Sequence, residues 1–226
     1  DLETFVDALG FACFRGDETN VLKRYADAAD VYDADIVVRI TGDCPLVDPN
    51  VVDSCLELFL ASEVDYASNV MPPTYPDGLD VEVFTTTTLR RAVELASDPF
   101  DLEHVTPFIR RNEGFKTVNL SAQSNFEHFR LTLDYEEDLK ILNAIFKELS
   151  GQFFFGWESA VQVLYKLDRV NQLNEGYARW EGSKMSLGQK VWSRAKQIIP
   201  NGNMLLSKRP DMFLPNSWPA YYEKAE

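Results

Sequence analysis

The sequence predicts an α/β fold with a mostly parallel sheet, followed by a C-terminal helical or extended tail. Three observations lead to this fold class. Short β-rich segments alternate with amphipathic segments of about 10–15 residues, which is the pattern of βαβ units. The run "DIVVRI" is apolar almost throughout, as in strands that helices cover on both faces. The chain has 226 residues, enough for one large domain or for a domain with a further fragment.

The strands are predicted from short runs rich in β-branched and aromatic residues. They lie at residues 11–14, 35–40, 64–69, 81–84, 115–120 and 128–133. The helices are predicted from apolar residues at helical spacing. They lie at residues 1–9, 20–33, 50–62, 89–97, 100–111, 135–150 and 156–175. Gly10 closes the first helix and Asp17 or Thr19 caps the second, while Pro107 either kinks its helix or opens a second segment.

The character of the chain changes after Gly151. We expect one domain at residues 1–176, a polar linker at 177–185 and the start of another domain at 186–226. An amphipathic helix is predicted at 186–199, ended by "PNG". The last 25 residues hold three of the eleven prolines and no clear element.

Composition excludes several classes of protein. The net charge of −14 argues against a nucleic-acid polymer or an anionic membrane as partner, because either needs clustered Lys and Arg. The negative net charge of the protein is compatible with a small anionic ligand if a metal ion or helix N-termini offset the charge of that ligand. No apolar run approaches the ~20 residues of a membrane-spanning helix. Cys13, Cys44 and Cys55 form no C-x-x-C pair, so we expect neither disulfides nor zinc, and a cytoplasmic location.

Two aspartates follow predicted strands. Asp43 follows "IVVRITG", and Asp134 follows "FRLTL". In an open α/β sheet, ligands lie outside the carboxyl ends of the strands. Two carboxylates brought together there suit Mg²⁺, which leaves its other positions for water and substrate phosphates. Gly42 would let a phosphate or sugar approach the backbone closely.

Each of these residues also has a structural interpretation. Asp43 could be only a turn residue. Asp134 could be a helix N-cap with Glu137 at position N3, and capping is also the favoured role of Asp48. Cys44 is expected to be buried, because a soft thiol is a poor ligand for Mg²⁺.

Three further residues could reach a ligand or could be ordinary structural residues. Arg15 follows a predicted strand end and could be an exposed turn residue. Asp77 lies in the turn "YPDG", next to more acidic residues than a turn needs. His104 is favoured as a partly buried residue with a satisfied side chain. Because the common nucleotide-binding, hydrolase and protease motifs are absent, spacing alone indicates an α/β domain with a metal–phosphate site.

Several stretches together resemble the cytidylyltransferase family, which includes CMP-Kdo and CMP-sialic acid synthetases and the spore-coat polysaccharide type. They occur in the family's order, over roughly residues 1–176: "FRGDETNVLKRY", "ADIVVRITGDCPLVDP", "DYASN", "YPDGLDVEVF", "EHVTPFI" and "FRLTLDYEEDLKIL". The resemblance implies a Rossmann-like nucleotidyltransferase fold. It also implies that a hydroxyl of a sugar or sugar acid attacks the α-phosphorus of CTP and that pyrophosphate leaves.

The resemblance implies roles for individual residues. Asp43 and Asp134 would be the catalytic pair that holds Mg²⁺. Arg15 and Gly16 of "FRGDE", with Gly42, would lie near the nucleotide. The acceptor-facing residues would be Asp77, Glu82 and His104.

The chain departs from the family pattern at its start. Members begin with a strand and a basic loop, R-x-x-S-x-R-x-P-x-K, which grips the triphosphate, and this sequence contains no such loop. We therefore expect an N-terminally truncated cytidylyltransferase that is inactive as it stands. The segment "SLGQKVWSRAKQIIPNG" resembles the start of class III aminotransferases of the glutamate-1-semialdehyde aminomutase type. This implies a bifunctional protein whose PLP would bind only in the missing part.

Three functions are therefore weighed. The first is a cytidylyltransferase for surface polysaccharide, with CTP and a sugar or sugar acid as substrates and a homodimer left open. The second is a PLP-dependent aminotransferase with an accessory domain. The third is a non-catalytic module that binds nucleotide or sugar.

Overall fold

The structure is a computed structural model that describes residues 2–152 and 154–166. All of them belong to the first of the two units into which the chain divides, Asp1–Tyr177. The linker predicted at 177–185 and the helix predicted at 186–199 lie outside the described residues, as does the rest of the tail. The aminotransferase segment therefore stays a prediction from sequence.

A four-stranded sheet lies at the centre, in the order β1-β3-β2-β4. Its strands are β1 (Ile36–Arg39), β2 (Tyr66–Ser68), β3 (Glu82–Thr85) and β4 (Thr117–Asn119). β3 runs antiparallel to β1 and β2, whereas β2 and β4 are parallel, so β1, β2 and β4 share one direction. The predicted α/β class is confirmed, and the sheet is mixed because β3 is reversed.

The last row of residues at the carboxyl edge of the sheet is polar. Arg39 of β1 lies opposite Glu82, Glu82 lies opposite Ser68, and Ser68 lies opposite Asn119. Directly paired residues point to the same face of a sheet. One face therefore ends in a continuous polar row from β1 to β4.

Eight helices surround the sheet in the described part of the chain. They are α1 (Leu2–Ala8), α2 (Val21–Val31), α3 (Pro49–Ala61), α4 (Thr86–Leu95), α5 (Pro99–His104), α6 (Pro107–Arg111), α7 (Glu136–Glu148) and α8 (Trp157–Lys166). Asp48 caps α3 by accepting a hydrogen bond from the Asn50 N–H at 2.8 Å, which confirms its predicted role. Among these described helices, none has the length and apolar content to cross a membrane.

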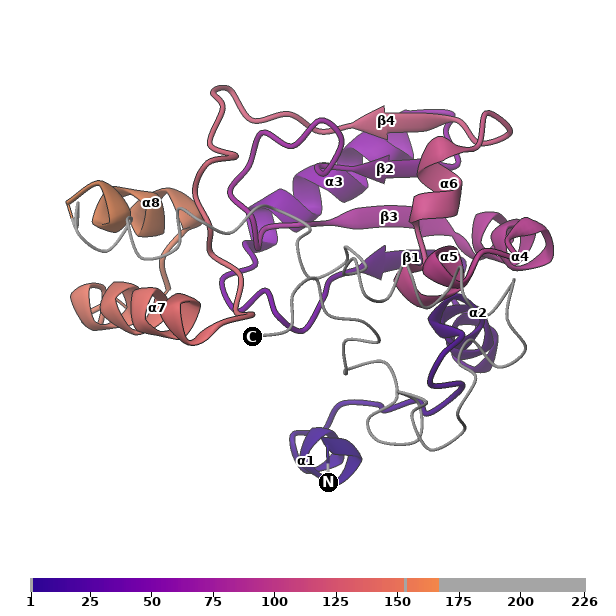
Figure 1. The fold of residues 1–226 in the computed structure, drawn as a ribbon, viewed down its shortest axis with the longest axis horizontal. Helices are drawn as coiled ribbons and strands as arrows, with labels where there is room; N and C mark the ends of the chain where they lie inside the picture. Colours follow the sequence, from indigo (N-terminus) through magenta and orange to yellow (C-terminus); the bar gives the residue numbers. More distant parts are fainter. Residues whose placement is uncertain (1, 153, 167–226) are drawn as a thin grey trace, which may run out of the picture. The chain divides into compact units, whose positions relative to one another are not determined.

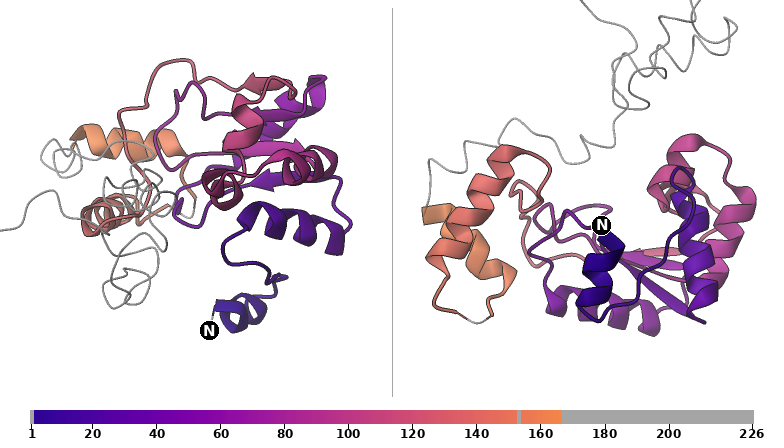
Figure 2. Two further views of the ribbon diagram at one scale, coloured as in Figure 1. Left: turned by 45° about the vertical axis from the view of Figure 1, so that its right-hand side comes forward. Right: turned by 90° about the horizontal axis from the view of Figure 1, so that it is seen from below.

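Both faces of the sheet are covered (Figures 1 and 2). On one face, Val51, Cys55 and Phe59 of α3 pack against Ala67 and Val83 of the sheet. On the other face, Leu22 of α2, Leu89 of α4 and Ile109 of α6 pack against Tyr66 and Phe84 of the sheet. Cys44 is buried, as predicted, and Cys55 is buried as well; all three cysteines are free thiols in the structure.

A third core holds the α7–α8 pair. Ile141 and Ile145 of α7 and Leu164 of α8 pack with Leu131, which precedes α7. Figure 1 shows this pair beyond the carboxyl ends of β1 and β4. The pair thus supports the segment that leads to Asp134 at that edge of the sheet.

Several predicted boundaries were wrong. "FACF" forms no strand, and Phe11 is 67% exposed, because no neighbouring backbone pairs with it among the described residues. The N-cap of α2 is Asn20, which accepts from the Lys23 N–H at 2.9 Å, and not Asp17 or Thr19. Of the two roles predicted for Pro107, the opening of a second segment is confirmed, since Pro107 begins α6 and Val105, with φ at 73°, separates α5 from α6.

Two predicted strands also differ from the structure. β1 lies at an edge of the sheet, and each of its residues is only partly buried, unlike the fully covered strand that "DIVVRI" indicates. "HFRLTL" contributes only an isolated bridge between Asp77 and Arg130. The rest of that segment is extended and is held by single contacts to turns.

Candidate active site

Asp43 lies in a tight turn just beyond β1. The turn is closed by the Cys44 N–H, which donates to the carbonyl of Thr41 at 3.2 Å. The Thr41 hydroxyl donates to Oδ1 of Asp43, and the Cys44 thiol lies 3.6 Å from the same oxygen. Asp43 is therefore a turn residue, and its carboxylate also occupies the strand-end position that a ligand site requires. A Cβ added at Gly42 would meet nothing within 4 Å, so the backbone there is open to a close approach.

The extended segment before α7 joins two loops. On one side, the Asp77 N–H donates to the carbonyl of Phe129 at 2.9 Å, and the Leu131 N–H donates to the carbonyl of Asp77 at 2.7 Å. On the other side, the Leu133 N–H donates to the carbonyl of Asp43 at 2.8 Å. These bonds bring the Asp77 loop and the Asp43 turn to the same segment.

Gly78 permits this close approach. Its φ is +96°, a conformation that favours glycine. A Cβ at Gly78 would lie 2.5 Å from the backbone nitrogen of Thr132 and 2.6 Å from the carbonyl carbon of Leu131. No larger residue fits there without displacing the segment.

The hydroxyl of Thr132 lies between the two predicted metal ligands. It donates to the carbonyl of Asp43 at 3.0 Å and lies 3.4 Å from Oδ2 of Asp134. Because both aspartates contact the same hydroxyl, they are neighbours at the carboxyl edge of the sheet. The structure thus brings together the two residues that the sequence selected.

A buried arginine, which sequence reasoning did not single out, organises the carboxylates. Arg130 is 8% exposed and contacts three aspartates: Asp134 through Nη2 at 2.5 Å, Asp77 through Nη1 at 3.0 Å and Asp138 through Nε at 2.9 Å. Burial alone would lower the pKa of Arg130, but its hydrogen bonds and ion pairs with Asp138, Asp77 and Asp134 raise it. Arg130 is therefore a permanent cation at the centre of this cluster.

The capping role proposed for Asp134 is wrong. The N-cap of α7 is Tyr135, and the N3 residue is Asp138, one position later than the sequence indicates. Asp138 accepts from the N–H groups of Asp134 and Tyr135, both at 3.0 Å. Burial would raise the pKa of Asp138, but the hydrogen bonds from Arg130 and from these two N–H groups lower it. The Asp134 carboxylate faces Arg130 and Thr132 and caps no helix.

The donor set fits a hard cation. Asp43 and Asp134 would supply carboxylate oxygens to such a cation, and no group of three or more His, Cys, Asp or Glu suited to a metal occurs among the described residues. A site with one or two carboxylates and further positions for water and phosphate is typical of Mg²⁺. Cys44 does not suit a metal, because burial raises the pKa of its thiol to about 12.

The residues expected near the acceptor occupy different surroundings. Glu82 is buried, pairs with Arg39, and accepts hydrogen bonds from the Tyr66 hydroxyl at 2.5 Å and from the Thr106 hydroxyl at 2.6 Å. Its observed role is to hold the polar row together, and contact with a ligand stays a prediction. His104 ends α5 and packs on Phe100, with ring centroids 4.4 Å apart.

Two of the residues expected near the nucleotide, Arg15 and Gly16, lie on the N-terminal segment. The side chain of Arg15 is 70% exposed and pairs with Glu3 at 2.9 Å. A Cβ at Gly16 would lie 2.9 Å from the Arg24 side chain, so this glycine fits closely against α2. The structure gives both residues structural contacts, and their nucleotide contact stays a prediction.

Comparison with known proteins identifies the family. A sequence model of the cytidylyltransferase family matches residues 2–184. This chain belongs to the cytidylyltransferase family. An uncharacterized protein of Methanocaldococcus jannaschii is 38% identical over 172 residues, which cover 74% of this chain and 67% of that protein. The spore coat polysaccharide biosynthesis protein SpsF of Bacillus subtilis is 29% identical over 150 residues, 65% of this chain and 62% of SpsF.

A solved structure supports the same assignment. The cytidylyltransferase from Leptospira borgpetersenii matches with a TM-score of 0.70 and 31% sequence identity, over 76% of this chain and 73% of that chain. The α/β architecture with its mixed sheet is thus that of a known cytidylyltransferase. The chain spans about two thirds of the length of the relatives it matches.

Proposed function

We propose that this protein transfers CMP from CTP to a hydroxyl of a sugar or sugar acid, in the synthesis of a surface polysaccharide. Membership of the cytidylyltransferase family and the likeness to a spore coat polysaccharide protein support this proposal. The observation that carries it is the placement of Asp43 and Asp134 around the hydroxyl of Thr132. Two aspartates held beside one threonine at this edge of the sheet would supply the carboxylates that a magnesium–triphosphate substrate requires.

The proposed reaction is a single displacement at phosphorus. The hydroxyl oxygen of the acceptor forms a bond to the α-phosphorus of CTP, and the hydroxyl proton is lost. The bond from the α-phosphorus to its bridging oxygen breaks, and pyrophosphate leaves with that oxygen. The products are a CMP-sugar and pyrophosphate.

The chain's residues would prepare the site for this displacement. Asp43 and Asp134 would hold Mg²⁺, which when bound supplies charge to polarise the phosphoryl oxygens and to lower the pKa of the attacking hydroxyl. Thr41 orients the Asp43 carboxylate, and Arg130 orients Asp134. A carboxylate already held in one direction loses less entropy on binding a ligand.

The remaining contacts are assigned by position. Arg15, Gly16 and Gly42 would contact the nucleotide. Asp77, Glu82 and His104 would face the acceptor. Gly42 has the most direct support, because the space around it is open.

The test is CTP-dependent release of pyrophosphate by the full-length protein. Acceptors would include 3-deoxy-manno-octulosonate (Kdo), N-acetylneuraminate and neutral sugars, each with and without Mg²⁺. Release that requires both CTP and an acceptor supports the proposal. Tight binding of CTP or sugar without release would favour the alternative, a non-catalytic binding module.

The aminotransferase half is a separate proposal that rests on the sequence of residues 186–226 alone. A full-length protein with that activity would purify with bound PLP, visible in its absorption spectrum. A protein that neither contains nor takes up PLP would contradict this part without affecting the cytidylyltransferase.

A further inference from the structure

We propose that Asp77 is a positioning residue for the metal ligand Asp134, and that it acts through the guanidinium of Arg130. In this role, Asp77 raises the affinity of Asp134 for a divalent cation, in addition to the acceptor contact proposed above. The inference rests on the proposed function and deepens it, because it connects the loop that carries Asp77 to the metal site.

One buried guanidinium holds three carboxylates at once. Nη1 of Arg130 donates to Asp77 at 3.0 Å, and Nη2 donates to Asp134 at 2.5 Å. Nε and Nη2 also donate to the two carboxylate oxygens of Asp138, at 2.9 and 3.0 Å. Asp77 and Asp134 therefore contact different nitrogens of the same planar group, so a change of charge at one alters the hydrogen bond at the other.

The three carboxylates differ in their access to solvent. The side chain of Asp138 is 0% exposed, that of Asp77 is 14% exposed and that of Asp134 is 37% exposed. Asp138 is thus the buried partner of Arg130, whereas Asp134 is the partner open to a ligand. A cation that binds Asp134 must share this carboxylate with the guanidinium, and the two positive charges repel each other.

The balance of charge sets the sign of the effect. Three aspartates against one arginine leave an excess of two negative charges, which a divalent cation would neutralise. While Asp77 shares the guanidinium, less of the attraction of Arg130 falls on Asp134. A neutral residue in place of Asp77 would concentrate that attraction on Asp134 and leave the positive charge of Arg130 less compensated. The affinity of Asp134 for a cation should then fall.

The backbone fixes the contact between Asp77 and Arg130. The Asp77 N–H donates to the carbonyl of Phe129 at 2.9 Å, and the carbonyl of Asp77 accepts from the Leu131 N–H at 2.7 Å. Asp77 thus pairs with the residues on both sides of Arg130, and an isolated bridge joins Asp77 to Arg130 itself. The carboxylate and the guanidinium therefore meet at a distance that the fold determines.

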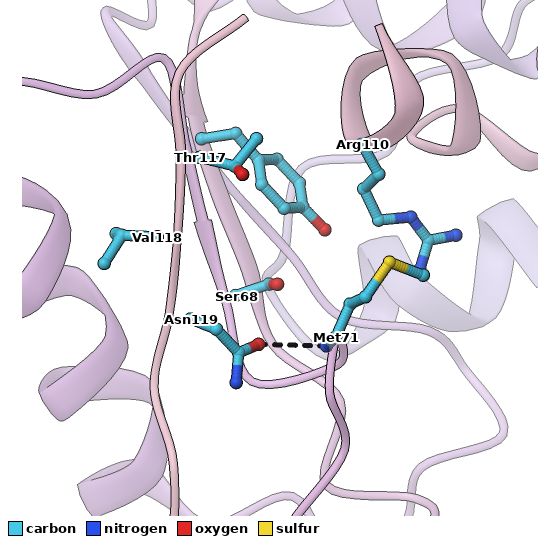
Figure 3. A pocket seen from close by; sticks show the side chains of 7 residues that line it. Ser68, Met71, Arg110, Thr117, Val118 and Asn119 are labelled. Carbon is cyan, nitrogen blue, oxygen red and sulfur yellow. Dashed lines mark hydrogen bonds between the residues drawn. The ribbon is translucent and has the colours of Figure 1, made fainter. Parts of the chain in front are cut away.

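The loop that presents Asp77 is also tied at both ends. Near its start, Asn119 of β4 accepts a hydrogen bond from the Met71 N–H at 2.9 Å, drawn as the dashed line in Figure 3. Near its end, buried Asn69 donates to the carbonyl of Leu79 at 2.7 Å. Asp77 is therefore presented from a loop that is held in place, as a positioning role requires.

The experiment measures binding of a cation without turnover. Mn²⁺ is the probe, because it takes oxygen ligands as Mg²⁺ does and its free form is measured by electron paramagnetic resonance. The full-length protein is titrated as wild type, Asp77→Asn, Asp134→Asn and the double variant. We expect Asp77→Asn to weaken Mn²⁺ binding at least about fivefold, as for two coupled sites. In the Asp134→Asn background, the same substitution should change binding by at most about twofold.

Two further variants assign the coupling to Arg130. Arg130→Lys keeps the charge, but a single ammonium lacks the planar fork that reaches both aspartates. In this background we expect Asp77→Asn to change Mn²⁺ binding by at most about twofold. The control is Asp65→Asn, which breaks an ion pair with Arg91 just before β2 and should leave Mn²⁺ binding unchanged. Circular dichroism would verify that each variant is folded, and the cycle with Asp134 does not depend on Arg130→Lys.

The outcomes separate this inference from the proposed function. Weaker Mn²⁺ binding in Asp77→Asn that depends on the Asp134 carboxylate supports the inference, even if no pyrophosphate is released. An equal effect of Asp77→Asn with and without that carboxylate would indicate simple loss of charge and would overturn the inference, as would unchanged or tighter binding. If wild type binds no Mn²⁺ through Asp134, the inference and the metal site both fail. Absence of pyrophosphate release with the expected Mn²⁺ cycle would contradict the proposed function alone.

Discussion

Arg130 and Asp134 form an ion pair with 2.5 Å between Nη2 and Oδ2, beside the hydroxyl that also bonds the carbonyl of Asp43. The carboxylate proposed to hold Mg²⁺ is therefore held in place by a buried cation. A metal ion would have to share Asp134 with Arg130. The guanidinium thus sets the direction of the carboxylate and moderates its affinity for a metal.

Replacing either proposed metal ligand should remove activity without unfolding the protein. We expect Asp43→Asn and Asp134→Asn each to lower CTP-dependent pyrophosphate release by about a hundredfold or more, as for loss of a group that stabilises charge in the transition state. The Asp134 side chain caps no helix, so Asp134→Asn should cost little stability. The matched control is Asp53→Asn, on an exposed position of α3. Normal turnover in both site variants would remove the metal-site hypothesis.

Gly78→Ala should destabilise the protein strongly. The added methyl group would clash with backbone atoms of Leu131 and Thr132, in a conformation that alanine rarely adopts. We expect the free energy of unfolding, measured in urea, to fall by more than about 2 kcal/mol. Gly42→Ala is the control, because a methyl group there meets nothing within 4 Å. Equal stability of the two variants would show that the segment before α7 shifts to accommodate the methyl group at little energetic cost.

The contribution of Asp138 to stability should depend on pH. Its pKa is lowered in the folded protein, so its contribution is present above the unfolded-state pKa of about 3.9 and is lost as pH falls through the lower folded-state pKa. Asp138→Asn should therefore lower the free energy of unfolding at neutral pH by about 3 kcal/mol, as for a broken buried pair. The difference from wild type should shrink below about pH 4. A difference that stays constant in acid would contradict this account of the Arg130 cluster.

His104 should stay neutral at neutral pH. Burial lowers its pKa below the usual 6.5, with Arg39 and Arg110 adding to the effect against the opposing charges of Glu103 and Asp101. An NMR titration, with the resonance assigned through His104→Gln, should give a value under 6.5. Removing the charge of Arg110 should move the pKa upward. A pKa above 6.5 in wild type would show that the nearby acids dominate.

The sequence predicted the parts of the fold that depend on local patterns. β2, β3 and β4 lie where apolar and β-branched runs indicated, and Asp48 caps α3 as its position before Pro49 suggested. "FACF" was wrong because an apolar run becomes a strand only where a neighbouring strand is available. The segment before Asp134 was only partly predicted, since its backbone bonds go to turns at Asp43 and Asp77, which lie far away in sequence.

In the candidate site too, local sequence patterns predicted some residues, whereas others depend on contacts between distant parts of the chain. Asp43 and Asp134 could be selected because strand ends converge at one edge of an α/β sheet. The role of Arg130 could not, because its partner Asp77 is 53 residues away and only folding reveals the contact. The capping error was a shift of one residue, from Asp134 with Glu137 to Tyr135 with Asp138. That shift matters because the Asp134 carboxylate, which does not cap the helix, pairs with Arg130 and can bind a ligand.

The central claim is that an acceptor hydroxyl attacks the α-phosphorus of CTP. The most direct measurement supplies the full-length protein, Mg²⁺ and an acceptor with CTP that carries ³²P at either the α or the γ position. The account predicts that the α label appears in the CMP-sugar and that the γ label leaves as pyrophosphate. Transfer of the γ label to the sugar, or no transfer of the α label to any acceptor of the panel, would contradict it.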